Sequence, residues 1–137
     1  MLFRSLEGGE EHYHFLQGYD RIDIALDTFP YNGGTTTTEA LWQGVPVLTY
    51  AGDRWVARTS ASLLRAAGLD AWLARDEDDL LAKASALARD PATPDRLATL
   101  RAGLRARLAD SAACDTAGLC RALEQIYLEA CSNRRVS

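Results

Sequence analysis

The sequence is poor in cysteine and has no long apolar run. Its three cysteines, Cys114, Cys120 and Cys131, lie in the last quarter of the 137 residues, at spacings that match no common zinc or redox motif. We therefore expect free thiols and no metal site, with Cys120 buried as a small hydrophobic residue on an apolar helical face. No apolar run approaches the ~20 residues that a membrane-spanning helix needs.

The first residues also lack the features of a secretion signal. They contain no apolar stretch of signal-peptide length, and their early charges do not form a basic leader. Together with the absence of a spanning run, this predicts a cytoplasmic protein that binds no membrane.

Positive charge is scarce as well. The net charge is −4 and the isoelectric point is about 5.1. Nucleic-acid binding needs concentrated positive charge, so we expect no nucleic acid as the main partner. The arginines that do gather, Arg96, Arg101, Arg105 and Arg107, stand beside acidic neighbours and predict a solvated helix face.

The chain does contain enough apolar residues for one core. Hydrophobic residues make up 47% of the sequence and charged residues 25%, as is usual for a globular protein. A length of 137 residues suits one domain. We expect this domain over residues 1–131, followed by a tail over 132–137 that has no apolar stripe.

Strand-like and helix-like segments alternate in the first half of the chain. Residues 22–29 form a short apolar run that closes on Pro30, and residues 45–50 form a second, β-branched run. Between them, turn residues lead into a helical segment over 35–42 that ends at Gly44. Such a strand–helix–strand unit favours a parallel sheet with a right-handed crossover. The predicted fold class is therefore α/β, with a Rossmann-like sheet.

Helical patterns dominate the remainder. We expect Asp53 to cap a helix over 54–67, a short strand over 71–74, and helices over 76–89 and from Thr93 onward. The C-terminal third is thus predicted to be helical. Its last helix carries an apolar stripe, and the three tryptophans are expected in the core. The residues concerned are Leu119, Leu123, Ile126, Tyr127 and Ala130 for the stripe, and Trp42, Trp55 and Trp72.

The segment Asn32-Gly33-Gly34-Thr35-Thr36 links the first predicted strand to its helix. Ligands of open α/β folds bind beyond the carboxyl ends of the strands, and a helix N-terminus offers unpaired N–H groups to an anion. The glycines would let the backbone approach a phosphate, and the threonine hydroxyls would add donors. Glycines in this place are also typical of a plain turn, and neither the P-loop nor the G-x-G-x-x-G spacing is present.

Glu39, one turn into the same helix, has two interpretations. Its carboxylate could accept both hydroxyls of a ribose, as acidic residues do in dinucleotide-binding folds. Thr36 and Glu39 also have the spacing of a capping box, in which the carboxylate closes back on the helix N-terminus.

The run from Tyr19 to Thr49 closely resembles the C-terminal catalytic region of the O-linked N-acetylglucosamine transferase family, including its bacterial SPINDLY-like members. Its core is Asp27-Thr28-Phe29-Pro30-Tyr31-Asn32-Gly33-Gly34-Thr35-Thr36-Thr37-Thr38-Glu39-Ala40-Leu41-Trp42. The likeness continues through Gly52-Asp53-Arg54, Arg58, Ala61-Ser62-Leu63-Leu64 and Ala67-Gly68-Leu69, and more loosely to about Leu128.

This resemblance implies the C-terminal lobe of a GT-B glycosyltransferase. Such enzymes transfer N-acetylglucosamine from UDP-GlcNAc to a serine or threonine of an acceptor protein, and a second lobe and tetratricopeptide repeats precede this one. By likeness, Gly34, Thr35 and Thr36 would contact the diphosphate and Glu39 would hold the ribose. His12 would lie near the uracil, with His14 as the alternative. No cofactor is implied.

Departures from the family limit these expectations. Animal members have a histidine where this chain has Gly34, and a basic residue at the position of Gly9. No general base can be assigned. Alternative functions are therefore a sugar-nucleotide-binding module without catalysis and a partner-docking module.

Overall fold

The computed structural model describes residues 12–133. Gly9, the N-terminal segment expected to lack a leader and the last four residues of the expected tail lie outside this range. Three short strands, β1 (Ala25–Leu26), β2 (Val47–Tyr50) and β3 (Leu73–Ala74), form one sheet in the order β1-β2-β3. Both strand pairs are parallel. The predicted α/β class with a parallel sheet is therefore confirmed.

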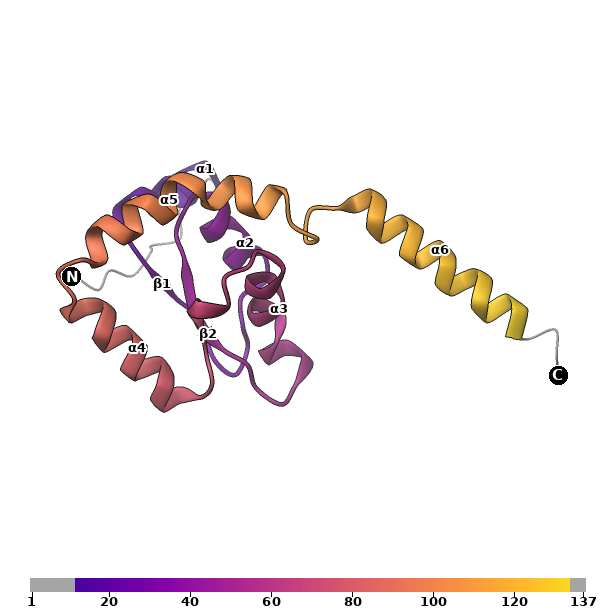
Figure 1. Ribbon diagram of the computed structural model, residues 1–137, viewed down its shortest axis with the longest axis horizontal. Helices are drawn as coiled ribbons and strands as arrows, with labels where there is room; N and C mark the ends of the chain where they lie inside the picture. Colours follow the sequence, from indigo (N-terminus) through magenta and orange to yellow (C-terminus); the bar gives the residue numbers. More distant parts are fainter. Residues whose placement is uncertain (1–11, 134–137) are drawn as a thin grey trace.

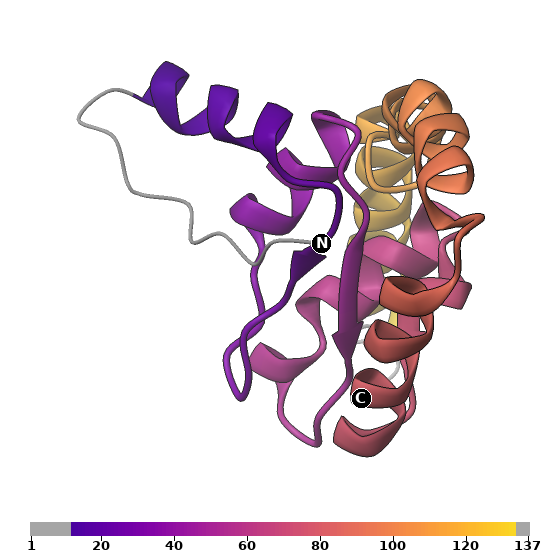
Figure 2. The same cartoon turned by 90° about the vertical axis from the view of Figure 1, so that its left-hand side faces the viewer.

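Helices precede, connect and follow the strands (Figure 1). Figure 2 shows α1 and α4 on opposite sides of the strands. The α-helices are α1 (His12–Gln17), α2 (Thr35–Trp42), α3 (Thr59–Ala66), α4 (Glu77–Arg89), α5 (Thr93–Ala109) and α6 (Thr116–Asn133). Three single turns of 3-10 helix are η1 (Gly18–Arg21), η2 (Trp55–Ala57) and η3 (Asp70–Trp72).

The helix between β1 and β2 has the bounds that its sequence predicts. Hydroxyl residues begin α2, and Gly44 ends it in the left-handed region at φ +83°. There the N–H of Gly44 donates to the carbonyl of Leu41, and the N–H of Val45 donates to Ala40. Gly68 stops α3 in the same way, at φ +66°.

Several sequence-based boundaries are wrong. The strand expected over 71–74 is reduced to β3, because residues 70–72 form η3. The strand expected over 22–29 pairs with β2 only at Ala25 and Leu26. The helix expected over 54–67 is split into η2 and α3, and Asp53 does not cap it. The N–H of Gly52 donates to the carbonyl of Ala57 at 2.9 Å, which closes residues 52–57 into a turn before α3 can begin.

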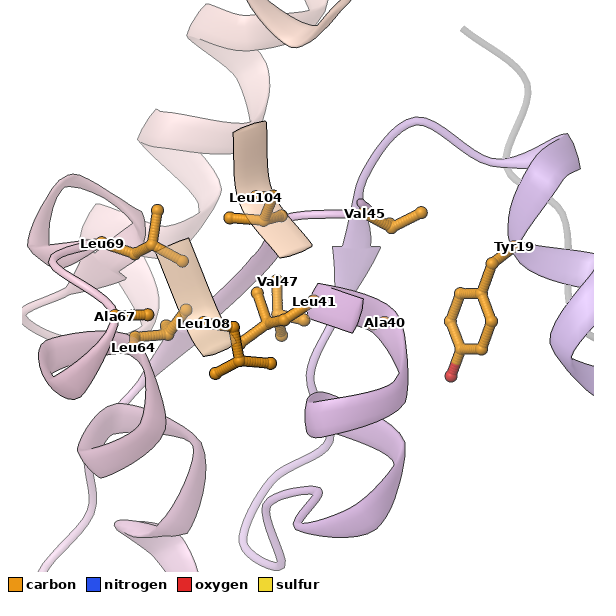
Figure 3. Packing of buried hydrophobic residues seen from close by; sticks show 10 residues of the cluster. All are labelled: Tyr19, Ala40, Leu41, Val45, Val47, Leu64, Ala67, Leu69, Leu104 and Leu108. Atoms are coloured by element: carbon orange, nitrogen blue, oxygen red, sulfur yellow. The ribbon is translucent and has the colours of Figure 1, made fainter. Parts of the chain in front are cut away.

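The core lies between the sheet and helices α2, α3 and α5. Leu41, Leu64, Leu104 and Leu108 are at most 1% exposed and surround Val47 of β2 (Figure 3). Burying one such leucine contributes about 1.5–3 kcal/mol. Packing around β2 therefore fixes the position of α2, and with it the loop that precedes α2.

The C-terminal third is helical as predicted, but its last helix is not packed. α6 extends away from the sheet (Figure 1), and its apolar stripe is exposed. The cysteines are free as expected, although Cys120 is exposed because no element within residues 12–133 covers α6. α6 also continues to Asn133, past the expected start of the tail. Trp55, at 79% exposure, and Trp42, at 41%, are not core residues either.

The arginine-rich face of α5 is not simply solvated. Arg101 donates to the carbonyls of Ile22 and Tyr19, at 3.1 and 2.7 Å. Arg105 donates to the carbonyl of Trp42 at 2.8 Å, and its guanidinium lies over the Trp42 ring. A cation at the C-terminus of α2 also complements the helix dipole. These two arginines tie α5 to the elements that carry the predicted nucleotide site.

Candidate functional site: the loop between β1 and α2

Asp27, directly after β1, organises the loop. Its Oδ1 accepts hydrogen bonds from the N–H groups of Thr28 and Gly33, at 3.0 and 2.8 Å. Its Oδ2 accepts from the hydroxyl of Thr49 on β2 at 2.7 Å. One carboxylate thus holds both ends of the loop against the neighbouring strand. This role of Asp27 is not apparent from the sequence.

Asn32 is buried inside the loop, with 3% exposure. Its Nδ2 donates to the carbonyl of Thr28 and its N–H to the carbonyl of Val56, both at 2.9 Å. Its Oδ1 is buried without a hydrogen-bond partner among residues 12–133. The Asn32 side-chain amide therefore supports the loop from within, with one Nδ2 hydrogen bond to Thr28.

The two glycines of the loop differ. A Cβ on Gly33 would lie 2.6 Å from the hydroxyl oxygens of both Thr36 and Thr37, so this position has no room for a side chain. A Cβ on Gly34 would meet only Thr59 Cγ2, at an ordinary 3.6 Å, and the φ of Gly34 is −117°. The closeness of the two threonine side chains therefore requires glycine at position 33, whereas position 34 has room for a Cβ.

The four threonines that begin α2 divide into two pairs. Thr37 is buried and its hydroxyl lies 2.8 Å from that of Ser60, while the hydroxyl of Thr38 donates to the carbonyl of Gly34 at 3.0 Å. Thr35 and Thr36 are exposed, and their hydroxyls have no partner within the described chain. Thr35 and Thr36, chosen from the sequence as phosphate contacts, are the pair with unused donors.

Backbone donors add to these hydroxyls. Gly34 precedes the first turn of α2, and no side chain caps that turn. The N-terminus of α3 lies beside it, because the Ser60 hydroxyl in the first turn of α3 donates to the carbonyl of Gly33 at 2.9 Å. Two helix N-termini, each carrying about half a positive charge, therefore converge at Gly34. Unpaired N–H groups and this partial charge suit an anion.

Glu39 pairs with His12 and does not close back on its own helix. His12 Nε2 lies 3.3 Å from Glu39 Oε1. Since α2 has no side-chain cap, the capping-box interpretation is wrong. Glu39 is anchored in the body of α2, so its carboxylate reaches α1 more readily than the first turn. His14 has no such contact with Glu39, so the structure brings together His12 and Glu39 among the predicted residues.

Tyr19 supports the start of α2. Its hydroxyl donates to the carbonyl of Thr36 at 3.2 Å. Burial, with a smaller contribution from the charge of Glu39, raises the pKa of Tyr19 to about 12. The phenol therefore stays neutral and keeps donating at neutral pH. Tyr19 is a second supporting residue that the sequence analysis did not identify.

A hollow of about 250 Å³ lies at the carboxyl end of β1. Its walls come from η1, β1, the loop and α2, and they include Tyr19, Asp27, Thr28 and Thr36. The hollow therefore lies where open α/β folds bind their ligands. Across residues 12–133, no three histidine, cysteine, aspartate or glutamate side chains are grouped so that they could hold a metal ion. No helix within that range is long and apolar enough to cross a membrane.

The fold and this loop define a Rossmann-like α/β unit whose carboxyl edge presents donors suited to an anion. Residues 1–123 match glycosyl transferase family 41, and the chain belongs to that family. The resemblance drawn from the sequence is thereby confirmed.

The relatives are much longer proteins. A probable UDP-N-acetylglucosamine–peptide N-acetylglucosaminyltransferase SPINDLY from Solanum lycopersicum is 42% identical over 116 residues, which cover 85% of this chain and 12% of the relative. The UDP-N-acetylglucosamine–peptide N-acetylglucosaminyltransferase of Caenorhabditis elegans is 29% identical over 126 residues, covering 92% and 10%. The chain thus spans about an eighth or less of the curated relatives that it matches.

A solved structure supports the same family assignment. A mutant O-GlcNAc transferase from Thermobaculum terrenum superimposes with a TM-score of 0.77 at 39% identity, over 90% of this chain and 24% of the other. The predicted GT-B lobe therefore corresponds to part of a known transferase structure.

Proposed function

We propose that this chain is the donor-binding lobe of a protein O-glycosyltransferase, which holds UDP-GlcNAc for transfer of N-acetylglucosamine to a serine or threonine hydroxyl. The observation that carries the proposal is the pair of unused hydroxyls, on Thr35 and Thr36, beside the unpaired N–H groups at the start of α2. The names of the relatives supply the donor and the acceptor class.

In this proposal the diphosphate binds at Gly34, Thr35 and Thr36, and Glu39 accepts the ribose hydroxyls. His12, which now lies beside Glu39, would face the uracil. Asn32 and Gly33 hold the loop in its conformation through their hydrogen bonds to Thr28 and Asp27. The two carboxylate oxygens offer about four acceptor positions, so the ribose hydroxyls can bind Glu39 beside its contact with His12.

The chemistry that these residues would supply is stabilisation of the departing UDP. Negative charge grows on the diphosphate as the glycosidic bond breaks, and fixed N–H and hydroxyl donors are most effective against charge that develops in the transition state. The described residues provide no assigned general base. We propose that transfer also needs acceptor-binding parts, a second lobe and repeats, beyond the eighth of the relatives' length that this chain spans.

Calorimetric titration of UDP into the chain tests this function. The wild-type chain should bind UDP, and the Thr35→Ala/Thr36→Ala variant should bind it about tenfold or more weakly, because it loses hydrogen bonds to a charged group. Thr99→Ala/Thr116→Ala is the matched control, since both threonines are exposed and lie on α5 and α6. GDP titrated in parallel measures selectivity for the base.

A folded wild-type chain that does not bind UDP would refute the proposal. Equal binding by the loop variant and its control would also contradict the assignment of Thr35 and Thr36. Transfer is assayed separately, with UDP-GlcNAc and a serine-containing peptide. Nucleotide binding without transfer by the chain alone is the expected result.

A further inference from the structure

Asp27 has a part in the site beyond its place in the loop. We propose that Asp27 is a positioning residue, which orients the backbone N–H groups that receive the diphosphate. This inference rests on the proposed function. It assigns no contact between Asp27 and the nucleotide, because the carboxylate acts through the peptide groups on either side of Gly33.

The peptide group that joins Asn32 to Gly33 is held by Asp27. The N–H of Gly33 donates to Asp27 Oδ1 at 2.8 Å, so this N–H is not available to a phosphate. The same carboxylate is held from β2 by the Thr49 hydroxyl at 2.7 Å. Because Thr49 is 1% exposed and belongs to the central strand, the carboxylate cannot swing away without breaking a buried hydrogen bond.

The peptide group that joins Gly33 to Gly34 is held by Ser60. The carbonyl of Gly33 accepts from the buried hydroxyl of Ser60 at 2.9 Å. A peptide group is planar and trans, so the N–H of Gly34 must point opposite to that carbonyl. Holding Gly33 by its N–H at Asp27 and by its carbonyl at Ser60 therefore sets the direction of the first free donor.

A competing effect has the opposite sign. Asp27 is a carboxylate close to a loop that is to bind an anion, and like charges repel. If repulsion dominated, removing the charge would strengthen the binding of a diphosphate. The three hydrogen bonds that Asp27 accepts distribute its charge over neighbouring dipoles, so we expect the positioning effect to be the larger of the two.

Four variants separate these effects. Asp27→Ala removes both the charge and the acceptors. Asp27→Asn removes the charge alone, because the amide oxygen can still accept from Gly33 while the amide nitrogen donates to the Thr49 hydroxyl. Thr49→Val deletes the hydroxyl at nearly constant shape, and Thr49→Ser keeps it.

The measurement is the ratio of the affinities for UDP and for uridine in the full 137-residue chain. This ratio isolates the diphosphate, and general loss of structure would lower both affinities together. We expect Asp27→Ala to lower it about tenfold or more and Thr49→Val to lower it several-fold. Asp27→Asn and Thr49→Ser should stay within about twofold of wild type.

Val45→Ala is the control for stability, because Val45 is fully buried and lies just before β2, at the opposite edge of the sheet from the loop. The inference is overturned if Asp27→Ala retains or raises the ratio, or if Val45→Ala lowers it equally. Thr49→Val tests the same link from β2, so the result does not depend on the folding of Asp27→Ala. A wild-type chain that binds UDP no better than uridine would overturn the proposed function and this inference together.

Discussion

The two loop glycines lead to opposite expectations for the same substitution. Gly33→Ala places a methyl group 2.6 Å from the hydroxyl oxygens of Thr36 and Thr37. The exposed Thr36 side chain can rotate away, but that of Thr37 is held by Ser60 at 2.8 Å. Gly34→Ala places a methyl group at an ordinary 3.6 Å from Thr59 Cγ2, and the φ of −117° at Gly34 lies outside the left-handed region that favours glycine.

The magnitude follows from these contacts. Overpacking at Gly33 costs about 1–3 kcal/mol, and losing the Thr37 hydrogen bond costs about 0.5–1.5 kcal/mol more. Replacing glycine also stabilises the native state by about 0.4–1 kcal/mol through the unfolded chain. Since this gain is common to both variants, it cancels in their difference. Gly33→Ala should therefore be about 1.5–4.5 kcal/mol less stable than Gly34→Ala.

Urea unfolding followed by circular dichroism measures this difference. With ordinary slopes for a chain of this size, the two midpoints should differ by about 1–2 M. Gly34→Ala should unfold at or slightly above the wild-type midpoint. Equal midpoints for the two variants, or a Gly34→Ala that is the less stable one, would refute the geometry described for the loop.

Three further outcomes are expected. Gly44→Ala should lower stability by about 2–4 kcal/mol in the same unfolding assay, because it combines left-handed strain with a Cβ 2.7 Å from Arg101 Cγ. The folded-state pKa of Tyr19 is raised to about 12, so the neutral phenol stabilises the folded state. This contribution to the free energy of unfolding is complete below pH 10 and is lost as pH rises toward 12. The free energy of unfolding should fall over that window by about 2–3 kcal/mol more in wild type than in Tyr19→Phe, and parallel curves would contradict this. Glu39→Gln should reduce the preference for UDP over its 2′-deoxy analogue by several-fold, and an unchanged preference would argue against ribose binding by Glu39.

Local signals made part of the fold predictable. The bounds of α2 depend on a hydroxyl run and on Gly44, which lie within ten residues of each other in the sequence, and they were predicted correctly. The split between η2 and α3 depends on how residues 52–57 close as a loop, which helical periodicity does not report. Periodicity also marked the apolar stripe of α6. It could not show whether any element covers that stripe, so the predicted burial of Cys120 was wrong.

The residues of the candidate site were likewise only partly predictable from the sequence. Apart from His12, the residues proposed to contact the nucleotide lie in one short segment, 32–39, and the family resemblance indicated them. The residues that support this segment belong to other elements: Thr49 to β2, Ser60 to α3 and Tyr19 to η1. A single sequence carries no signal for these pairings, since each joins residues 17 to 27 positions apart. Asp27 stood inside the recognised run, yet its role appeared only with its partners.

The run of four threonines also constrains insertions and deletions. Four identical residues suggest that one could be lost without consequence. In a helix, however, deleting one residue rotates everything before it by about 100° relative to everything after it. A single deletion between Thr35 and Thr38 would leave the local composition almost unchanged, but it would break the alignment of Gly33 with Thr37 and of Glu39 with His12. The length of this run therefore matters to the shape of the candidate site as much as its chemistry does.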